Sequence, residues 1–196
     1  MNHRLFSGCI LFALLFLAGC KKETTEPTPQ PLPVTAKLSR TMAYQNSSTR
    51  FAAEYENDAF RHAASQSAEK LQFGFWTTYP AGSDGLSFSI PKARQKTGLV
   101  GTYTLATLPN PALGEAAVDY RFATGENCTV IFQSGTTLVE GSLVITAYDP
   151  KRKTLSGTYT VRLPGAYDPF DPSFLPEKRV NFTISGSFAN LPVKDE

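Results

Sequence analysis

The sequence predicts an all-β fold, an antiparallel β-sandwich or barrel of roughly eight to ten strands with at most one short helix. Three observations support this prediction. Short runs that alternate apolar with polar residues recur along the chain, turn-forming residues separate many of these runs, and almost no stretch has the period of an amphipathic helix. Parallel sheets are not expected, because they need strands that are apolar on both faces and long crossover helices.

The clearest strands lie near the C-terminus. Apolar or small residues occupy the odd positions of 155–163 and the even positions of 180–188, and polar residues occupy the positions between them. This period of two is typical of a strand with one face in the core. Asp149-Pro150 and the basic cluster 151–153 have turn chemistry, so they predict a hairpin between residues 143–147 and 155–163.

The other expected strands follow the same pattern. They cover residues 34–38, 51–55, 71–75, 86–90, 101–105, 118–122 and 128–132. The segment Asp58–Lys70 is the one weak helix candidate, since Asp58 has the chemistry of an N-cap. Gly101-Thr-Tyr103 is repeated as Gly157-Thr-Tyr159. We interpret the two copies as strands with similar local sequence requirements rather than as a duplicated sheet unit.

The N-terminal segment predicts export and a lipid anchor. Residues 1–19 have a basic head and an apolar run that is too short to span a membrane, as expected of a cleaved signal peptide. Leu17-Ala-Gly-Cys20 resembles the bacterial lipobox, and this resemblance implies lipidation of Cys20, with palmitate among the acyl chains. Residues 20–33 are rich in Pro and Thr and are expected to be a spacer. Residues 34–196 are then expected to form a single β domain on the cell envelope, at the outer membrane, with its side undecided.

The cysteine count excludes an internal disulfide in the mature protein. Cys9 would leave with the signal peptide and Cys20 would carry lipid, so Cys128 remains alone. Its parity with the apolar residues of 128–132 predicts a small buried side chain.

One stretch of the C-terminal half resembles a known group of proteins. Residues 141–159 read Gly-Ser-Leu-Val-Ile-Thr-Ala-Tyr-Asp-Pro-Lys-Arg-Lys-Thr-Leu-Ser-Gly-Thr-Tyr, and residues 180–188 read Val-Asn-Phe-Thr-Ile-Ser-Gly-Ser-Phe. These segments are similar to a pattern found in uncharacterised β-rich lipoproteins of Bacteroidota. The resemblance implies a β fold and an envelope address. It carries over no functional residue, because that group has no established activity.

Composition and motifs exclude several functions. The 19 Lys and Arg nearly balance the 17 Asp and Glu, which does not favour a nucleic-acid partner. Outside the signal peptide His62 is the single histidine, so neither a Ser-His-Asp triad nor an ordinary zinc site is expected. No glycine-rich phosphate loop is present. We therefore predict no catalytic residue, no metal site and no cofactor.

Trp76 is the first candidate for a binding surface. Its parity is opposite to that of Leu71, Phe73 and Phe75, so a regular strand would turn it away from the core. An outward Trp with Tyr79 nearby could stack on a sugar ring or on a partner's side chain, or it could cap one end of the sandwich.

The second candidate is the segment Pro164–Glu177, interpreted as a long connection. Its aromatic residues could fold over one end of the core or present an apolar surface to a partner or glycan: Tyr167, Phe170 and Phe174. Asp168 and Asp171 could instead bind Ca²⁺.

These expectations lead to a hypothesis of function. The chain is expected to be a lipid-anchored, non-enzymatic β domain that binds an envelope protein or glycan or has a structural role. The alternative is a lipocalin-like carrier in which a barrel encloses a small apolar ligand. A third alternative is a hydrolase that uses carboxylates alone.

Overall fold

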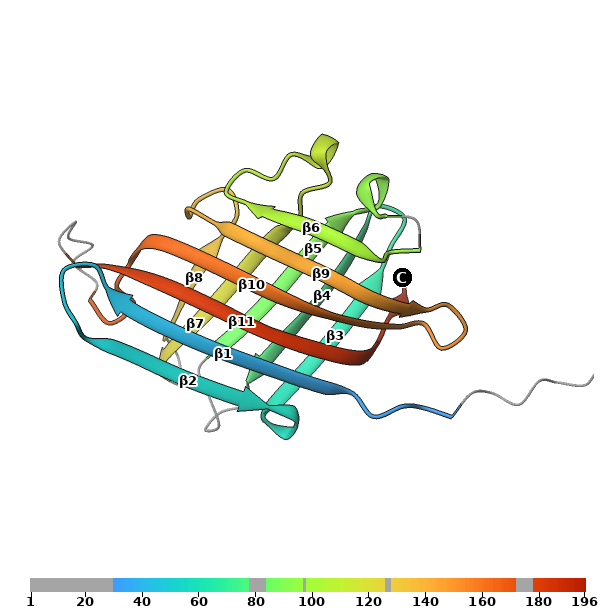
Figure 1. Ribbon diagram of the computed structural model, residues 1–196, viewed down its shortest axis with the longest axis horizontal. Coiled ribbons are helices and arrows are strands. Elements are labelled where there is room, and N and C mark those ends of the chain that lie inside the picture. Colours follow the sequence, from blue (N-terminus) through green and yellow to red (C-terminus); the bar gives the residue numbers. More distant parts are fainter. Residues whose placement is uncertain (1–29, 78–83, 97, 126–127, 172–177) are drawn as a thin grey trace, which may run out of the picture.

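A computed structural model describes residues 30–77, 84–96, 98–125, 128–171 and 178–196. Two six-stranded sheets pack face to face, which confirms the predicted all-β class and shows a sandwich of two separate sheets. The strands of the rear sheet cross those of the front sheet at a steep angle (Figure 1). Across the described ranges, no helix is long and apolar enough to cross a membrane.

Sheet A is the front sheet in Figure 1 and has the strand order β2-β1-β11-β10-β9-β6. All neighbouring strands in it are antiparallel. Its strands are β1 (Thr35–Tyr44), β2 (Arg50–Glu56), β6 (Gly101–Ala106), β9 (Glu140–Asp149), β10 (Thr154–Tyr167) and β11 (Arg179–Pro192).

Sheet B lies behind it and has the order β12-β3-β4-β5-β7-β8. The short β12 pairs in parallel with β3, and the other neighbours are antiparallel. Its strands are β3 (Phe60–Gln66), β4 (Lys70–Thr77), β5 (Asp84–Pro91), β7 (Ala117–Gly125), β8 (Cys128–Gln133) and β12 (Lys194–Asp195). Among the described residues, three single-turn 3₁₀ helices occur in connections, at Asn57–Ala59, Lys92–Arg94 and Pro111–Leu113.

Aromatic rings from both sheets fill the space between them. The Phe188 ring of sheet A lies 5.3 Å from the Phe73 ring and 5.4 Å from the Phe75 ring of sheet B. The Phe182 ring of sheet A lies 5.4 Å from the Tyr120 ring on the opposite side. Such ring pairs combine apolar burial with favourable quadrupole geometry. These phenylalanines therefore pack against one another and against Tyr120 in the space between the two sheets.

Two glycines of sheet A are covered by aromatic rings of the neighbouring strand. In the β10–β11 register, Gly157 faces Phe188 and Tyr159 faces Gly186. A Cβ added to Gly157 would lie 2.7 Å from the Phe188 ring, so only glycine leaves room for it. The Tyr159 ring crosses Gly186, and its hydroxyl donates a hydrogen bond of 3.0 Å to the Lys37 carbonyl of β1. This pairing gives a physical reason for the spacing of glycine and aromatic residue in Gly157-Thr-Tyr159 and Gly186-Ser-Phe188.

The two Gly-Thr-Tyr copies flank a single strand. Gly101–Tyr103 of β6 and Gly157–Tyr159 of β10 lie on opposite sides of β9. In both pairings the glycine faces Ile145 and the tyrosine faces Leu143, so the copies share one register. The same local sequence thus serves both flanks of β9.

Two expectations from the sequence are corrected. The helix considered for Asp58–Lys70 is wrong, because residues 60–66 form β3 and pair with β4. Phe60 and Ala64 of this strand are buried, and that spacing also fits a helix. The connection expected to start at Pro164 is partly strand, since β10 continues to Tyr167 after a register shift between Leu163 and Ala166.

The two ends of the described chain are held close together. β1 pairs with β11, and the Asn190 side chain donates a hydrogen bond of 3.0 Å to the Pro33 carbonyl. The segment after β11 then passes to sheet B, where β12 covers the edge of β3. A backbone hydrogen bond of 3.1 Å from Glu196 to Gln66 extends this contact.

Candidate functional site

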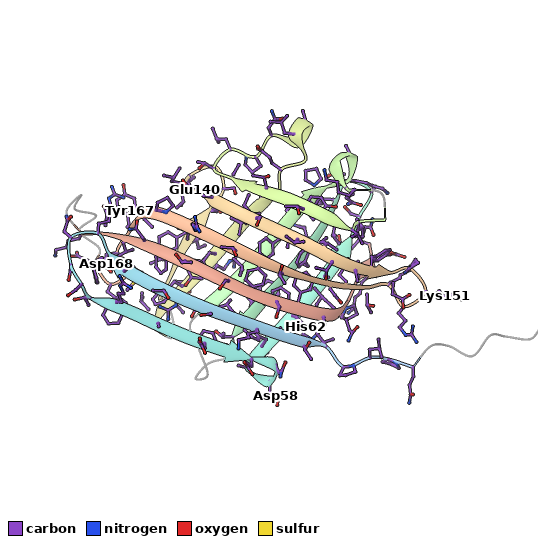
Figure 2. All side chains as sticks on the ribbon, viewed as in Figure 1. Asp58, His62, Glu140, Lys151, Tyr167 and Asp168 are labelled. Carbon is purple, nitrogen blue, oxygen red and sulfur yellow. The ribbon has the colours of Figure 1, made fainter. Side chains whose placement is uncertain are left out.

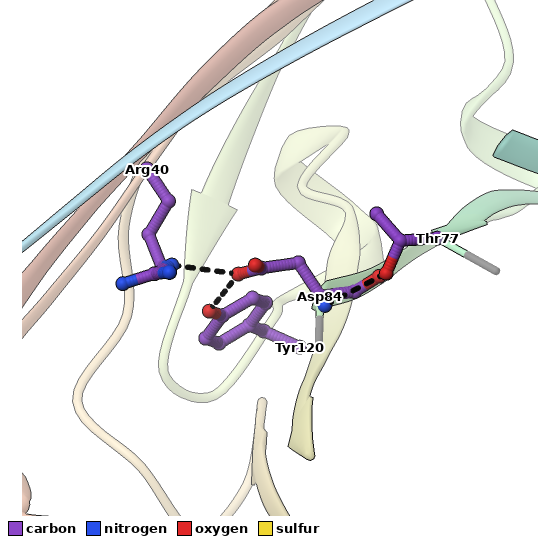
Figure 3. Close-up of polar contacts among 4 residues, drawn as sticks. All are labelled: Arg40, Thr77, Asp84 and Tyr120. Carbon is purple, nitrogen blue, oxygen red and sulfur yellow. Dashed lines mark hydrogen bonds and ion pairs between the residues drawn. The ribbon is translucent and has the colours of Figure 1, made fainter. Parts of the chain in front are cut away.

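A buried polar cluster joins the two sheets (Figure 3). The guanidinium Nε of Arg40, on β1, lies 2.9 Å from the Asp84 carboxylate of β5. The side chains of Arg40 and Asp84 are only 7% and 0% exposed. The Tyr120 hydroxyl of β7 donates a hydrogen bond to the same Asp84 oxygen, and the Arg40 guanidinium lies 5.0 Å from the centre of the Phe122 ring. The cluster therefore contains residues of both sheets.

Burial and charge determine the protonation states in this cluster. Burial disfavours the charged form of Arg40, but the Asp84 charge, Tyr120 and a hydrogen bond that Arg40 donates to Tyr55 outweigh it and raise the Arg40 pKa. Burial, followed by the charge and hydrogen bond of Asp84, raises the pKa of Tyr120 well above its ordinary value. Arg40 thus remains a cation and Tyr120 a neutral donor.

This cluster stabilises the fold and does not form a reaction site. The side chains of Arg40 and Asp84 have almost no access to solvent, so a substrate cannot reach them. Thr77 holds the backbone at Asp84 through two hydrogen bonds, to its carbonyl (2.9 Å) and from its amide (3.0 Å). Sequence reasoning missed the cluster. The available signal was Arg40 itself, which lies in the inward row of β1 with Leu38 and Met42 and needs a buried partner.

Trp76 lies on the outer face of sheet B, as its parity predicts. The β4–β5 register places it opposite Gly85. A Cβ added to Gly85 would lie 2.6 Å from the indole Cδ1, and one added to Gly74 would lie 2.9 Å from Cη2. Both ends of the indole are therefore close to the backbone, so the ring lies flat along the sheet. Both glycines are buried although they face outward, whereas Trp76 itself is only partly buried.

A groove of about 610 Å³ opens beside this ring. Its lining comes from β3, β4, β5 and the C-terminal segment: His62, Ala63, Ala64, Ser65, Gln72, Phe73, Trp76, Ser87, Phe88, Pro192, Lys194 and Glu196. The pairing registers place Ala63 and Ser87 on either side of Gly74, on the outward face. Because these side chains are small, the outer face of the sheet forms a depression here, which is the floor of the groove. Trp76 and the C-terminal segment border it.

The groove also contains polar groups with unused hydrogen-bonding capacity. In the part of the chain that the structure describes, the side chains of Ser65, Gln72 and Ser87 make no hydrogen bond to another residue. Lys194 pairs in register with Ser65, so its side chain stands on the same face. A flat aromatic ring, a low floor and several free donors and acceptors together form a surface suited to a small polar ligand.

The aromatic residues of the second candidate surface lie elsewhere. Tyr167 and Asp168 occupy the end of the sandwich opposite Lys151 (Figure 2). Tyr167 is the last residue of β10 and packs on Arg179, whose guanidinium lies 3.6 Å from the ring centre. Phe170 is 54% exposed, yet its ring contacts Phe51 of sheet A and Phe122 of sheet B at 6.2 and 5.4 Å. Phe170 therefore bridges the two sheets at this end, as in the interpretation of an aromatic flap over the core.

The acids of this segment make contacts within the protein. Asp168 accepts a hydrogen bond of 2.7 Å from the Tyr44 hydroxyl and another of 2.9 Å from the Phe170 amide. Asp171 forms an ion pair with Lys178. Within the described ranges, no group of three or more His, Cys, Asp and Glu residues is arranged to hold a metal ion.

Several residues singled out from the sequence lie outside the described residues. These are Cys20 with its signal and most of its spacer, Tyr79 and Phe174. For Cys128 only the backbone is described, as the first residue of β8. The turn predicted at 151–153 is confirmed between β9 and β10, where Arg152 contacts Asp149 at 2.9 Å.

The groove beside Trp76 thus has the chemistry of a candidate binding site. Comparisons of this chain with protein-family models, with curated proteins and with solved structures gave no match.

Proposed function

We propose that this protein is a lipid-anchored, non-enzymatic binding module of the cell envelope that holds its ligand in the groove on the outer face of sheet B. The observation that carries the proposal is the Trp76 ring, held flat on Gly74 and Gly85 with one face turned away from the sheet. An indole with one face open beside a groove can stack on a ligand or on a partner's side chain.

The lipid anchor is proposed from the sequence. Leu17-Ala-Gly-Cys20 resembles a lipobox, and residues 20–33 would form a tether between the lipid and β1. Labelled palmitate should enter the wild-type chain and should not enter a Cys20→Ala variant. Equal labelling of both chains would contradict the anchor.

The packed interior favours this proposal over a carrier. A lipocalin-like carrier needs a cavity between its strands, whereas rings such as Phe88 and Tyr159 contact each other across the two sheets at 5.4 Å. The groove with free polar groups lies on an outer face instead.

The proposal is tested by binding to purified envelope fragments. The full chain carrying Cys20→Ala, which removes the proposed lipid, gives the reference level of sedimentation with the fragments. Adding Trp76→Ala or Ser65→Ile should reduce this sedimentation, because the first removes the ring and the second fills the groove floor. Ile131→Ala is the matched control, since Ile131 is exposed and pairs with Arg121 on the same outer face but does not line the groove. Equal sedimentation of all four chains would refute the groove as the binding surface.

A further inference from the structure

The exposed face of Trp76 selects a particular shape of ligand. One face of the indole rests on two glycines, and no aromatic or cation–π contact among the described residues involves this ring. The electron-rich face of an indole attracts the positive edges of C–H groups. A flat ligand with C–H groups on one face therefore fits it best.

The polar side chains of the groove favour a ligand with hydrogen-bonding groups around its edge. Gln72 offers an amide donor and acceptor, and Ser65 and Ser87 each offer a hydroxyl. All three stand on the strand face that carries Trp76. A pyranose ring matches this arrangement, because its C–H groups form one face and its hydroxyls stand around the edge.

Size and charge narrow the ligand class. The groove volume of about 610 Å³ lies within the range of roughly 300–1,000 Å³ that is typical of small-ligand sites. This space suits a short oligosaccharide. The lining carries one Lys and one Glu, Lys194 and Glu196, so the formal charges of the lining residues cancel.

We infer that the groove binds a neutral saccharide, with a pyranose ring stacked on Trp76 and its hydroxyls bonded by Ser65, Gln72 and Ser87. The inference rests on the proposed function and names the ligand class for that same groove.

The chain contains a single tryptophan, so its fluorescence reports on this groove alone. The full-length chain would be titrated with neutral β-linked gluco-oligosaccharides and chito-oligosaccharides, and with oligogalacturonate as the charged comparison. A saturable change in Trp76 fluorescence with a neutral sugar, and none with oligogalacturonate at equal concentration, is expected.

Affinity would also be measured by calorimetry, which needs no tryptophan. Trp76→Ala should weaken binding by about tenfold or more, since loss of one stacking contact corresponds to about 1.4 kcal/mol. Gln72→Ala should weaken it less, and Ile131→Ala should leave it unchanged. Thermal denaturation of each variant would show that the sandwich remains folded.

Three results of the sugar titrations would each overturn the inference: binding of oligogalacturonate alone, binding of neutral sugars that Trp76→Ala does not alter, or no binding of any sugar. Concentration-dependent dimerisation that changes Trp76 fluorescence without sugar would also overturn it, by assigning the groove to a second copy of the chain. If sugars fail while sedimentation with envelope fragments still depends on Trp76, the ligand class is wrong and the proposed function stands.

Discussion

Aromatic rings lie over glycines on two faces of this sandwich, and the two places differ in what covers the ring. On the inner face of sheet A, Tyr159 crosses Gly186, and the opposite sheet packs against the ring, with Phe75 and Phe88 at 6.2 and 5.4 Å. On the outer face of sheet B, Trp76 crosses Gly85, and no described ring packs on its other side. The same local contact therefore packs the core in one place and leaves one face of the ring uncovered in the other.

Two neighbouring residues of β5 show the same contrast. Asp84 faces inward and forms a buried ion pair with Arg40, whereas Gly85 faces outward beneath Trp76. Mutations on the two faces should therefore have separable effects on stability and on binding.

The largest effect is expected from Gly186→Ala. The added methyl group would collide with the Lys37 carbonyl and with the Tyr159 ring, neither of which can move freely in the packed core. We expect a loss of about 3 kcal/mol or more in the free energy of unfolding, measured by denaturant unfolding. Ser187→Ala, at an exposed position of the same strand, is the control and should be near neutral. Equal stability of the two variants would show that the inner contact is not tight.

Asp84→Asn should be nearly as damaging. It removes the charge that compensates Arg40 and leaves a buried cation without its partner. A loss of about 3 kcal/mol in the free energy of unfolding is expected. The exposed pair Asp119–Arg121 provides the control, because Asp119→Asn should change stability little. If the Asp84→Asn variant were as stable as the wild type, Arg40 would have found another hydrogen-bond acceptor.

Alkaline pH should destabilise the fold through tyrosines whose pKa is raised in the folded chain, such as the partly buried Tyr44. Burial and the contact with Asp168 raise the pKa of Tyr44 from 10.0 to about 12. Between these two pH values the folded chain keeps a proton that the unfolded chain has lost, so the free energy of unfolding falls as the pH rises. Denaturant unfolding at several pH values should show a shallower fall for Tyr44→Phe. Parallel curves for the two chains would contradict this assignment.

Tyr159→Phe should have a smaller effect. The ring and its packing on Gly186 remain, but the hydrogen bond of 3.0 Å to the Lys37 carbonyl is lost. A cost of about 1 kcal/mol is expected from thermal or denaturant unfolding. A cost as large as that of Gly186→Ala would show that the hydroxyl matters more than the close packing.

Gly85→Ala should have the smallest effect on stability and the clearest effect on binding. The added methyl group meets only side chains, the Trp76 Cδ1 at 2.6 Å and the Arg121 Cβ at 3.6 Å, and the indole can tilt outward. We expect the free energy of unfolding to fall by less than about 1 kcal/mol. Trp76 fluorescence should change, and ligand binding in the groove should weaken. Unchanged fluorescence would show that the ring does not rest on Gly85.

The sequence was sufficient to predict features that depend on local alternation. These include the all-β class, the hairpin at Asp149–Pro150 and the outward direction of Trp76. Each follows from a period of two that is visible within a few residues. The segment 60–66 was ambiguous, because its two buried residues are four positions apart and fit either period.

Features that depend on pairing between distant segments could not be predicted. The facing of Gly157 and Phe188 depends on the β10–β11 register, which includes a shift between Leu155 and Gly157. The groove likewise needs the C-terminal segment to pair with β3, and two residues of strand give no recognisable pattern. The partner of Arg40 lies in the opposite sheet, so the sequence shows the need for a counter-charge but not its identity.

The hydrogen bond between Asn190 and Pro33 has a geometric consequence for the proposed lipid anchor. It fixes the point where the tether leaves the sandwich close to Pro192, which lines the groove. A fully extended chain between Cys20 and Pro33 reaches at most about 45 Å. With a lipid on Cys20, the length of residues 20–33 would limit the distance between the groove and the bilayer surface. A ligand of the groove would then have to lie within that distance of the membrane.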